Sequence, residues 1–361
     1  MDLTEYMNKS IESIIRSALK NTFSNPLEST FLLQMLRQQK KASELRSRQE
    51  KAGHHIPPFL IASIASQCNL HCAGCYARAN HSCCDEAAAQ ELSVERWMQI
   101  FHEALDLGVS FVLLAGGEPL VRRDILESAA KITNMIFPIF TNGTLLDTTY
   151  LDLFHQSRNL IPVLSIEGNK ETTDSRRGEG TYNLLQDVMG QLQEKGIFYG
   201  ASVTVTKQNL KQVTSDDFID LLRKKGCKLV FYVEYVPAVP GTEKLAPDDD
   251  DRDFLANRQE ELRSQFEEIL FLSFPGDEKN IGGCLAGGRG FFHINARGGA
   301  EPCPFSPFSD INLKDHSLSE AIHSPLFHKL REKGLANIPH NGGCALFERQ
   351  SEMKSLRIGD N

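Results

Sequence analysis

From Pro57 onward, short runs of apolar residues alternate with longer segments in which apolar and polar residues recur at helical spacing. This alternation predicts repeated strand–helix units and therefore a parallel sheet with helices packed on it. The predicted strands are Phe59–Ala65, Phe111–Ala115, Ile136–Phe140, Ile161–Ile166, Tyr199–Thr206 and Leu229–Val236. A complete parallel barrel has about eight such units, so six predict an α/β fold of the partial, TIM-like (β/α)6 type.

The segments on either side of the barrel have other patterns. Two helices, Leu3–Lys20 and Pro26–Lys51, are predicted ahead of it, and Pro26 suits the first turn of the second. A proline- and aspartate-rich stretch follows the barrel and precedes a predicted helix near Phe254–Leu272. A hairpin around Ala296–Gly299 and a helix from Leu318 to Lys333 are predicted later in the chain. The predicted division is 1–55 helical arm, 56–236 barrel, 237–275 linker and helix, and 276–361 small carboxyl-terminal unit.

Composition narrows the class of protein. With 361 residues, 41% of them apolar, the chain is long enough for a barrel and one smaller unit. No apolar run approaches a membrane-helix length and the amino terminus is polar and acidic, which favours a cytoplasmic protein without a membrane partner. The net charge of −8 gives no general attraction to nucleic acid. Nine cysteines in a chain of this kind favour metal ligands over disulfides.

Three of those cysteines, Cys68, Cys72 and Cys75, follow the first predicted strand in the segment SQCNLHCAGCY. Three thiolates on one short loop can hold three irons of a cubic cluster and leave the fourth iron open to a substrate or cofactor. The alternatives are a helix with a cysteine face, or a zinc site completed by His71 or His81. Gly74 and the position directly after a strand argue against the helix.

This spacing, with the aromatic Tyr76 after the last cysteine, resembles the signature of the radical S-adenosylmethionine (SAM) enzymes. In that family a [4Fe-4S] cluster binds SAM at its open iron. Gly116, Gly117 and Glu118 form a Gly-Gly-Glu-Pro segment after the second predicted strand, and this resembles the family loop that contacts the SAM ammonium group. The two motifs together favour the family more strongly than either alone.

Further SAM contacts follow from the same resemblance. They are Asn142 in a Thr-Asn-Gly turn, Ser165 and Glu167 at the end of the fourth predicted strand for the ribose, and Arg177 for the SAM carboxylate. Each also has an ordinary explanation as a turn, a solvated strand end or a surface arginine. Arg176 is an alternative to Arg177.

A second cysteine set, Cys284, Cys303 and Cys344, lies near the carboxyl end around glycine-rich turns. It resembles the SPASM and twitch extensions of radical SAM enzymes, which bind an auxiliary iron–sulfur cluster. The additional cysteines of a full SPASM unit are missing, so the resemblance implies one auxiliary cluster. Structural zinc and unrelated buried cysteines are the alternatives. The fourth ligand is left open among Cys227, Cys83, Cys84 and His340, with Cys83 and Cys84 expected to be bystanders.

The resemblance implies that a one-electron donor such as ferredoxin or flavodoxin reduces the first cluster, that SAM is cleaved to a 5′-deoxyadenosyl radical, and that this radical takes hydrogen from a substrate. Extensions of this kind favour a peptide or protein side chain as substrate. A small-molecule dehydrogenase is the first alternative, and a non-catalytic metal-binding protein is the second. No general acid or base, and thus no catalytic side chain, can be assigned from the sequence.

Overall fold

The computed structural model describes residues 3–20, 26–87, 90–276, 283–334 and 344–358. Its centre is one nine-stranded sheet with the order β7-β6-β5-β4-β3-β2-β1-β8-β9, in which all neighbours are parallel except β8 and β9. The strands are β1 Phe59–Ala65, β2 Phe111–Gly116, β3 Phe137–Thr141, β4 Leu160–Ser165, β5 Gly200–Val205, β6 Leu229–Glu234, β7 Leu270–Phe274, β8 His293–Ile294 and β9 Ala300–Glu301. The predicted α/β class and partial barrel are confirmed.

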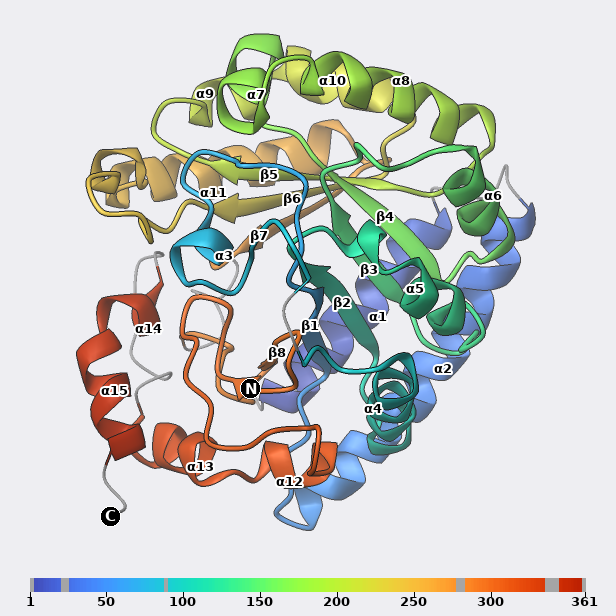
Figure 1. The fold of residues 1–361 in the computed structure, drawn as a ribbon. Coiled ribbons are helices and arrows are strands. Elements are labelled where there is room, and N and C mark those ends of the chain that lie inside the picture. Colours follow the sequence, from blue (N-terminus) through green and yellow to red (C-terminus); the bar gives the residue numbers. More distant parts are fainter. Residues whose placement is uncertain (1–2, 21–25, 88–89, 277–282, 335–343, 359–361) are drawn as a thin grey trace.

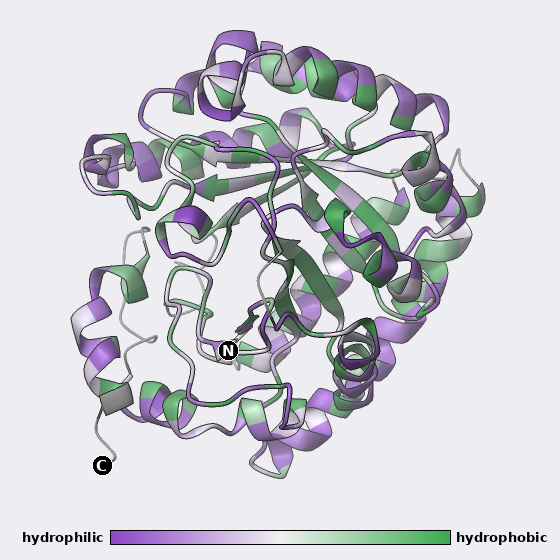
Figure 2. Ribbon diagram, in the orientation of Figure 1, coloured by the Kyte–Doolittle hydropathy of each residue, from purple (hydrophilic) through white to green (hydrophobic). Residues whose placement is uncertain are grey.

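Helices cover the outer face of this curved sheet (Figure 1). Those between the strands are α3 Tyr76–Ala79, α4 Val94–Leu107, α5 Arg123–Ala129, α6 Thr148–Gln156, α7 Lys170–Arg177, α8 Thr181–Glu194, α9 Leu210–Val213, α10 Asp216–Lys224 and α11 Asp249–Gln265, with short 3₁₀ turns at Pro119–Val121 and Glu243–Leu245. Their apolar residues face the sheet and their polar residues face outward (Figure 2). Side-chain caps such as Ser93 on α4 and Ser215 on α10 set their amino-terminal ends.

The structure corrects the sequence prediction in two places. The helix predicted to run from Phe254 to Leu272 ends at Gln265, and Leu270–Phe274 is a seventh parallel strand, paired with β6. The alternating, aromatic-rich run LFLSF is typical of a strand, but the glutamates just before it continue the helical pattern and extended the predicted helix too far. The helix predicted at Leu318–Lys333 is two helices, α12 Leu318–Ile322 and α13 Pro325–Glu332, because proline cannot continue the ladder of the first. The carboxyl-terminal helices α14 Ala345–Glu348 and α15 Gln350–Ile358 complete this unit.

The predicted hairpin is confirmed, and it is attached to the barrel. β8 pairs with β1 through Ile61–His293 and Ala62–Ile294, so the small unit extends the barrel sheet at its first strand. Phe291, just before β8, stacks on Phe59 of β1 at 5.2 Å and meets Phe274 of β7 edge-on at 5.6 Å. Aromatic packing therefore bridges the first and seventh strands.

The amino-terminal helices α1 Leu3–Lys20 and α2 Pro26–Lys51 were predicted with these bounds and lie against the barrel (Figure 1). Ile11, Ile15 and Leu19 of α1 belong to a cluster that includes Phe111 and Leu270, the first residues of β2 and β7. Helix α1 thus closes the end of the barrel at which the parallel strands begin. A search of the described helices finds none with both the length and the apolar character needed to cross a bilayer.

Candidate active site

The cysteine loop leaves the carboxyl end of β1, where parallel barrels hold their ligands. Cys75 is the amino-terminal cap residue of α3, and Gly74 before it has φ +70°. A Cβ atom at Gly74 would lie 2.4 Å from the Tyr235 hydroxyl, so only glycine fits there. Arg78 of α3 donates to the carbonyl oxygens of Cys68 and Leu70 and fixes the start of the loop.

The Gly-Gly-Glu-Pro segment lies directly against this loop. The Gly117 amide donates to the Ala65 carbonyl at 2.7 Å, and the Glu118 amide donates to the Gln67 carbonyl at 2.8 Å. Cβ atoms at Gly116 and Gly117 would lie 2.3 and 2.2 Å from those same two carbonyl oxygens. The glycines are therefore required for the two loops to meet.

Glu118 joins three loops at the carboxyl ends of the strands. Its carboxylate accepts from the Thr141 hydroxyl at 2.6 Å and from the amides of Leu120 and Asn142. The Asn142 side chain in turn donates to Asn69 of the cysteine loop at 2.9 Å. Burial raises the pKa of Glu118 to about 7, although these hydrogen bonds oppose the shift.

Helix α7 brings two arginines to the other side of the loop. Arg177 donates to the Cys72 thiol at 3.8 Å and to the Glu167 carboxylate at 2.5 Å, while its buried Nε atom has no hydrogen-bond partner among the described residues. Glu167 is 1% exposed, pairs with Arg176 at 3.2 Å and accepts the Thr204 amide. The carboxylate predicted to face the ribose therefore sits beneath the arginines.

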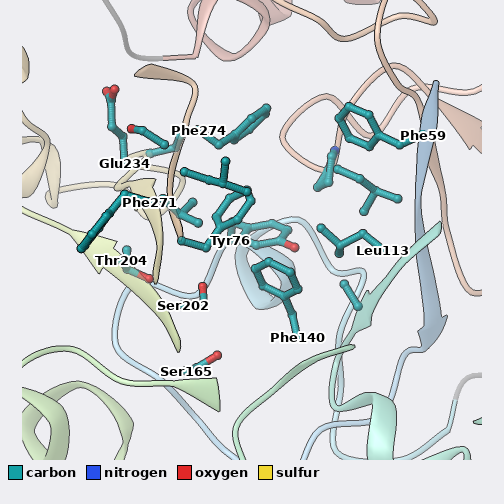
Figure 3. Close-up of a pocket in the computed structure, with 18 of the residues that line it drawn as sticks. Phe59, Tyr76, Leu113, Phe140, Ser165, Ser202, Thr204, Glu234, Phe271 and Phe274 are labelled. Carbon is teal, nitrogen blue, oxygen red and sulfur yellow. The ribbon is translucent and has the colours of Figure 1, made fainter. Parts of the chain in front are cut away.

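A cavity of about 1040 Å³ runs from the cysteine loop into the barrel. Among the described residues, its wall includes all three loop cysteines and most of the predicted SAM contacts, but not Glu167. The members from the sequence prediction are Cys68, Cys72, Cys75, Tyr76, Gly116, Gly117, Glu118, Asn142, Ser165 and Arg177. Ser165 faces this space together with Ser202 and Thr204 of β5 (Figure 3). The geometry thus gathers one site from six segments that are far apart in sequence.

The sequence analysis missed Cys83 as part of this site. Strand-like pairing between Gln67 and Cys84 brings the 82–85 segment back along the cysteine loop, and Cys83 then lines the same cavity. Its thiol hydrogen-bonds with Cys68, which lowers the pKa of Cys68 to about 6. The seven residues between Cys75 and Cys83 carry no motif, so only the three-dimensional structure identifies this neighbour.

The second cysteine set also comes together in the structure. Cys303 hydrogen-bonds with the Cys344 thiol and lies within electrostatic range of Cys284. Burial, followed by the neighbouring thiols, raises the pKa of Cys303 well above its usual value. Cys284 and Cys303 are 5% and 1% exposed.

The candidate fourth ligands of the second cysteine set differ in burial and in hydrogen bonding. Cys227 is enclosed before β6 and donates to the Leu229 carbonyl, and Cys84 is exposed and donates to Glu86. His340 lies outside the described residues.

Tyr76 stands between the two cysteine sets. Its ring packs on Phe305, two residues after Cys303, with centroids 4.7 Å apart. Burial raises the pKa of its phenol, and the thiols of Cys75 and Cys303 both add to that shift. A second connection runs from Ser63 of β1 to His293 Nε2 at 2.7 Å and from His293 Nδ1 to Glu301 at 2.7 Å. The barrel and the small unit are therefore joined by buried contacts.

The two cysteine sets supply thiolates, the ligands that iron–sulfur clusters use. Across the described residues, no three His, Cys, Asp or Glu side chains converge closely enough to ligate one metal ion. His71, the suggested zinc ligand, instead contacts Asp85 at 2.9 Å. The unpartnered Arg177 Nε at the cavity wall fits an anionic group of a cofactor.

Comparison with known proteins identifies the central part of the chain. Residues 63–231 match the sequence model of the Radical SAM superfamily. The chain is 29% identical over 53% of its length to Fe-coproporphyrin III synthase of Methanosarcina barkeri and spans 47%, about half, of that relative. It is 27% identical over 78% of its length to PqqA peptide cyclase of Rhizobium meliloti and covers 74% of that protein.

The fold is also found among solved structures. Streptococcus suis SuiB bound to precursor peptide SuiA matches with a TM-score of 0.66 and 19% identity, covering 89% of this chain and 77% of that one. The matched residues 63–231 begin within β1 and contain the cysteine loop, the glycine loop and α7, which are the elements that form the cavity. Residues 63–231 therefore form a radical SAM domain.

Proposed function

We propose that this chain uses SAM to take a hydrogen atom from a side chain or backbone carbon of a peptide. The observation that carries the proposal is the placement of Cys68, Cys72 and Cys75 on the wall of one large cavity, beside the glycine loop and Arg177. When bound there, a [4Fe-4S] cluster and SAM supply reductive cleavage to a 5′-deoxyadenosyl radical that abstracts hydrogen. An electron donor such as ferredoxin or flavodoxin would provide the electron.

The protein's own residues would hold and orient these groups. Cys68, Cys72 and Cys75 would ligate three irons, and the backbone at Gly116 and Gly117 would lie against the methionine part of SAM. Arg177 would pair with the SAM carboxylate, and Ser165 would bond to the ribose. Tyr76 and Asn142 complete this wall and help exclude water from the reacting atoms.

Cys284, Cys303 and Cys344 would hold an auxiliary cluster, as the carboxyl-terminal unit of the proposed division at residues 276–361. The burial of Cys284 and Cys303 supports a role in electron transfer, because a cluster shielded from water exchanges electrons without ligand exchange. Tyr76 and Phe305 lie between the two sites, which supports electron exchange between them.

A peptide substrate is supported by the relatives whose names specify peptides, PqqA peptide cyclase and SuiB bound to precursor peptide SuiA. The second candidate is a small molecule. It is favoured by the resemblance to Fe-coproporphyrin III synthase and by the largely apolar cavity wall.

The test is anaerobic reconstitution with iron and sulfide, followed by dithionite and SAM. Peptides and small molecules are extracted separately from cells grown on deuterated medium, and each fraction is added in turn. We expect 5′-deoxyadenosine to form and to gain deuterium from the peptide fraction. If 5′-deoxyadenosine gains deuterium only from the small-molecule fraction, the substrate is a small molecule and not a peptide. No reductant-dependent 5′-deoxyadenosine would contradict both and favour a metal-binding protein.

A further inference from the structure

The interior of the barrel is incompletely filled. On β1, β2 and β6 the outward-facing Leu60, Val112 and Val230 are fully buried under helices, whereas their inward-facing neighbours are only half-buried. Most of these inward residues line the 1040 Å³ cavity, and the apolar inward residues in its wall, with those of β3 and β7, are Phe59, Ile61, Phe111, Leu113, Phe140, Phe231, Val233, Leu270, Leu272 and Phe274. Figure 3 shows Phe59, Leu113, Phe140 and Phe274 directed into one space from four strands.

Such a cavity distinguishes this partial barrel from a complete eight-stranded one. Side chains normally fill the interior of a parallel barrel as a packed core. Large contiguous apolar surfaces that remain accessible usually bind something, because leaving them uncovered forgoes the free energy of burial. The strand interior is therefore shaped to be filled by a ligand.

Helix α1 forms the floor of this space. Eight α1 residues line the cavity: Tyr6, Met7, Lys9, Ser10, Ile11, Ser13, Ile14 and Ser17. Five of them, Tyr6, Ser10, Ser13, Ile14 and Ser17, recur at three- and four-residue intervals and lie on one face of the helix. Three of these five side chains are serines, which leave volume where larger residues would fill the barrel. We name the part of the cavity between Ser202 and this face of α1 the lower lumen.

Polarity changes along the cavity. Ser165, Ser202 and Thr204 present hydroxyls on one wall, toward the carboxyl ends of the strands (Figure 3). Toward the floor the strand positions are aromatic and aliphatic. Within the described lining, Lys and Arg occur on the helices α1, α7 and α11 but on none of the inward strand positions.

This pattern restricts what can occupy the lower lumen. A carboxylate-bearing macrocycle would find no cation on the apolar strand positions, and the cations of the lining near the floor are Lys9 of α1 and Arg263 of α11. A neutral aromatic ring instead matches walls made of Phe59, Phe111 and Phe231, since aromatic pairs gain from stacked and edge-on contacts. The hydroxyls above suit the amide groups of a peptide backbone.

We propose that the lower lumen, floored by α1, receives an aromatic side chain of the substrate peptide and so selects the residue that is presented to the SAM site. This inference rests on the proposed function. It assigns residues 3–20 to the substrate cavity, and it makes Leu113 and Ser10 determinants of substrate size.

The test uses reconstituted protein with SAM and no reductant, so that it does not depend on radical chemistry. The neutral fluorescent probe N-phenyl-1-naphthylamine should bind wild-type protein saturably with one site per chain. Leu113→Trp and, from the floor, Ser10→Phe should each weaken binding about 10- to 100-fold, because an overfilled site costs on the order of 1–3 kcal/mol. Leu33→Trp, at a 49% exposed position on α2, is the matched control and should bind as wild type.

Folding is checked independently, because filling a cavity commonly stabilises a protein. The melting temperature of at least one filled variant should equal or exceed that of wild type. Probe binding that is unchanged in both folded variants would overturn the assignment of the lumen.

A competition experiment tests the substrate class. The N-acetylated tripeptide amide Gly-Phe-Gly should displace the probe, and Gly-Ser-Gly should not. Displacement by coproporphyrin III but not by the phenylalanine peptide would overturn the peptide assignment. Because no step requires SAM cleavage, a failure here is distinguishable from a failure of the deuterium experiment.

Discussion

The two cysteine sets differ in what surrounds them. Cys68, Cys72 and Cys75 are half-buried on a loop at the strand ends and line a cavity that also holds Arg176 and Arg177. Cys284 and Cys303 are buried beside the hairpin and do not belong to the described lining of that cavity. Similar donor atoms therefore occupy one site on the wall of a large cavity and one site that is buried away from it.

The electrostatics distinguish Cys68 from Cys303, although burial also raises the pKa of Cys72 in the loop set. A hydrogen bond with Cys83 lowers the pKa of Cys68, whereas burial raises that of Cys303. A thiol that ionises near neutral pH is ready to bind iron, but a buried one depends on the metal to displace its proton. We infer that the exposed set performs ligand exchange at its open corner and that the buried set serves electron transfer.

The largest expected effect tests the exposed set. Cys72→Ala removes one of three ligands and should reduce SAM cleavage to background, measured as 5′-deoxyadenosine formed per reconstituted protein. Cys84→Ala, which removes an exposed cysteine, is the matched control and should keep its activity. Full cleavage by Cys72→Ala would show that this loop does not hold the cluster.

Removing a buried cysteine should have a different result. Cys303→Ala should stop product formation but retain part of the SAM cleavage, because the first site stays intact. Both quantities can be measured by chromatography of one reaction. If SAM cleavage falls as far as in Cys72→Ala while the circular dichroism spectrum is unchanged, the two cysteine sets do not have separate roles in SAM cleavage and product formation.

The arginines beside the exposed set sharpen the comparison. Arg177→Ala should weaken SAM binding about 10- to 100-fold, since charge-assisted hydrogen bonds contribute on the order of 1.5–3 kcal/mol. Arg176→Ala should weaken it less, because the Arg176 guanidinium lies over the Tyr235 ring at 5.6 Å. Equilibrium dialysis with labelled SAM measures the affinity of both variants. A larger loss of SAM affinity in Arg176→Ala would mean that Arg176, and not Arg177, pairs with the SAM carboxylate.

The contact between the two regions is expected to have a moderate effect. His293→Ala breaks both links of the Ser63–His293–Glu301 chain and should lower the free energy of unfolding by about 1–3 kcal/mol. Ser63→Ala breaks one link and should cost less. The midpoints of urea unfolding measure both losses. Midpoints equal to that of wild type would mean that the Ser63–His293–Glu301 hydrogen bonds do not hold the hairpin to β1.

The smallest expected effect concerns pH. Glu118 has a pKa of about 7 in the folded protein against 4.5 as its ordinary value, so the folded state binds its proton more tightly. Its contribution to stability is complete below pH 4.5 and is lost as the pH rises through about 7. Glu118→Gln should therefore flatten the dependence of the urea midpoint on pH across this range. An identical slope in both proteins would contradict the shift.

Much of this arrangement could be predicted from local patterns. Strands with continuous apolar runs, capped helices and the two glycine-containing motifs each carry their signal within about ten residues, and the structure places them together. Cys83, β7 and the downward turn of Glu167 could not be predicted this way. Cys83 reaches the site because the 82–85 segment returns along the cysteine loop. Strand β7 follows closely after helix α11, and Glu167 pairs with Arg176 and Arg177 and does not line the cavity.

The aromatic bridge through Phe291 has a mechanical consequence. In the described sheet, β7 and β8 share no backbone ladder, and Phe291 spans the seam between Phe274 and Phe59 by ring contacts. Ring contacts are less directional than backbone hydrogen bonds and tolerate sliding at small cost. At this seam ring contacts therefore replace the backbone hydrogen bonds that join neighbouring strands elsewhere in the described sheet.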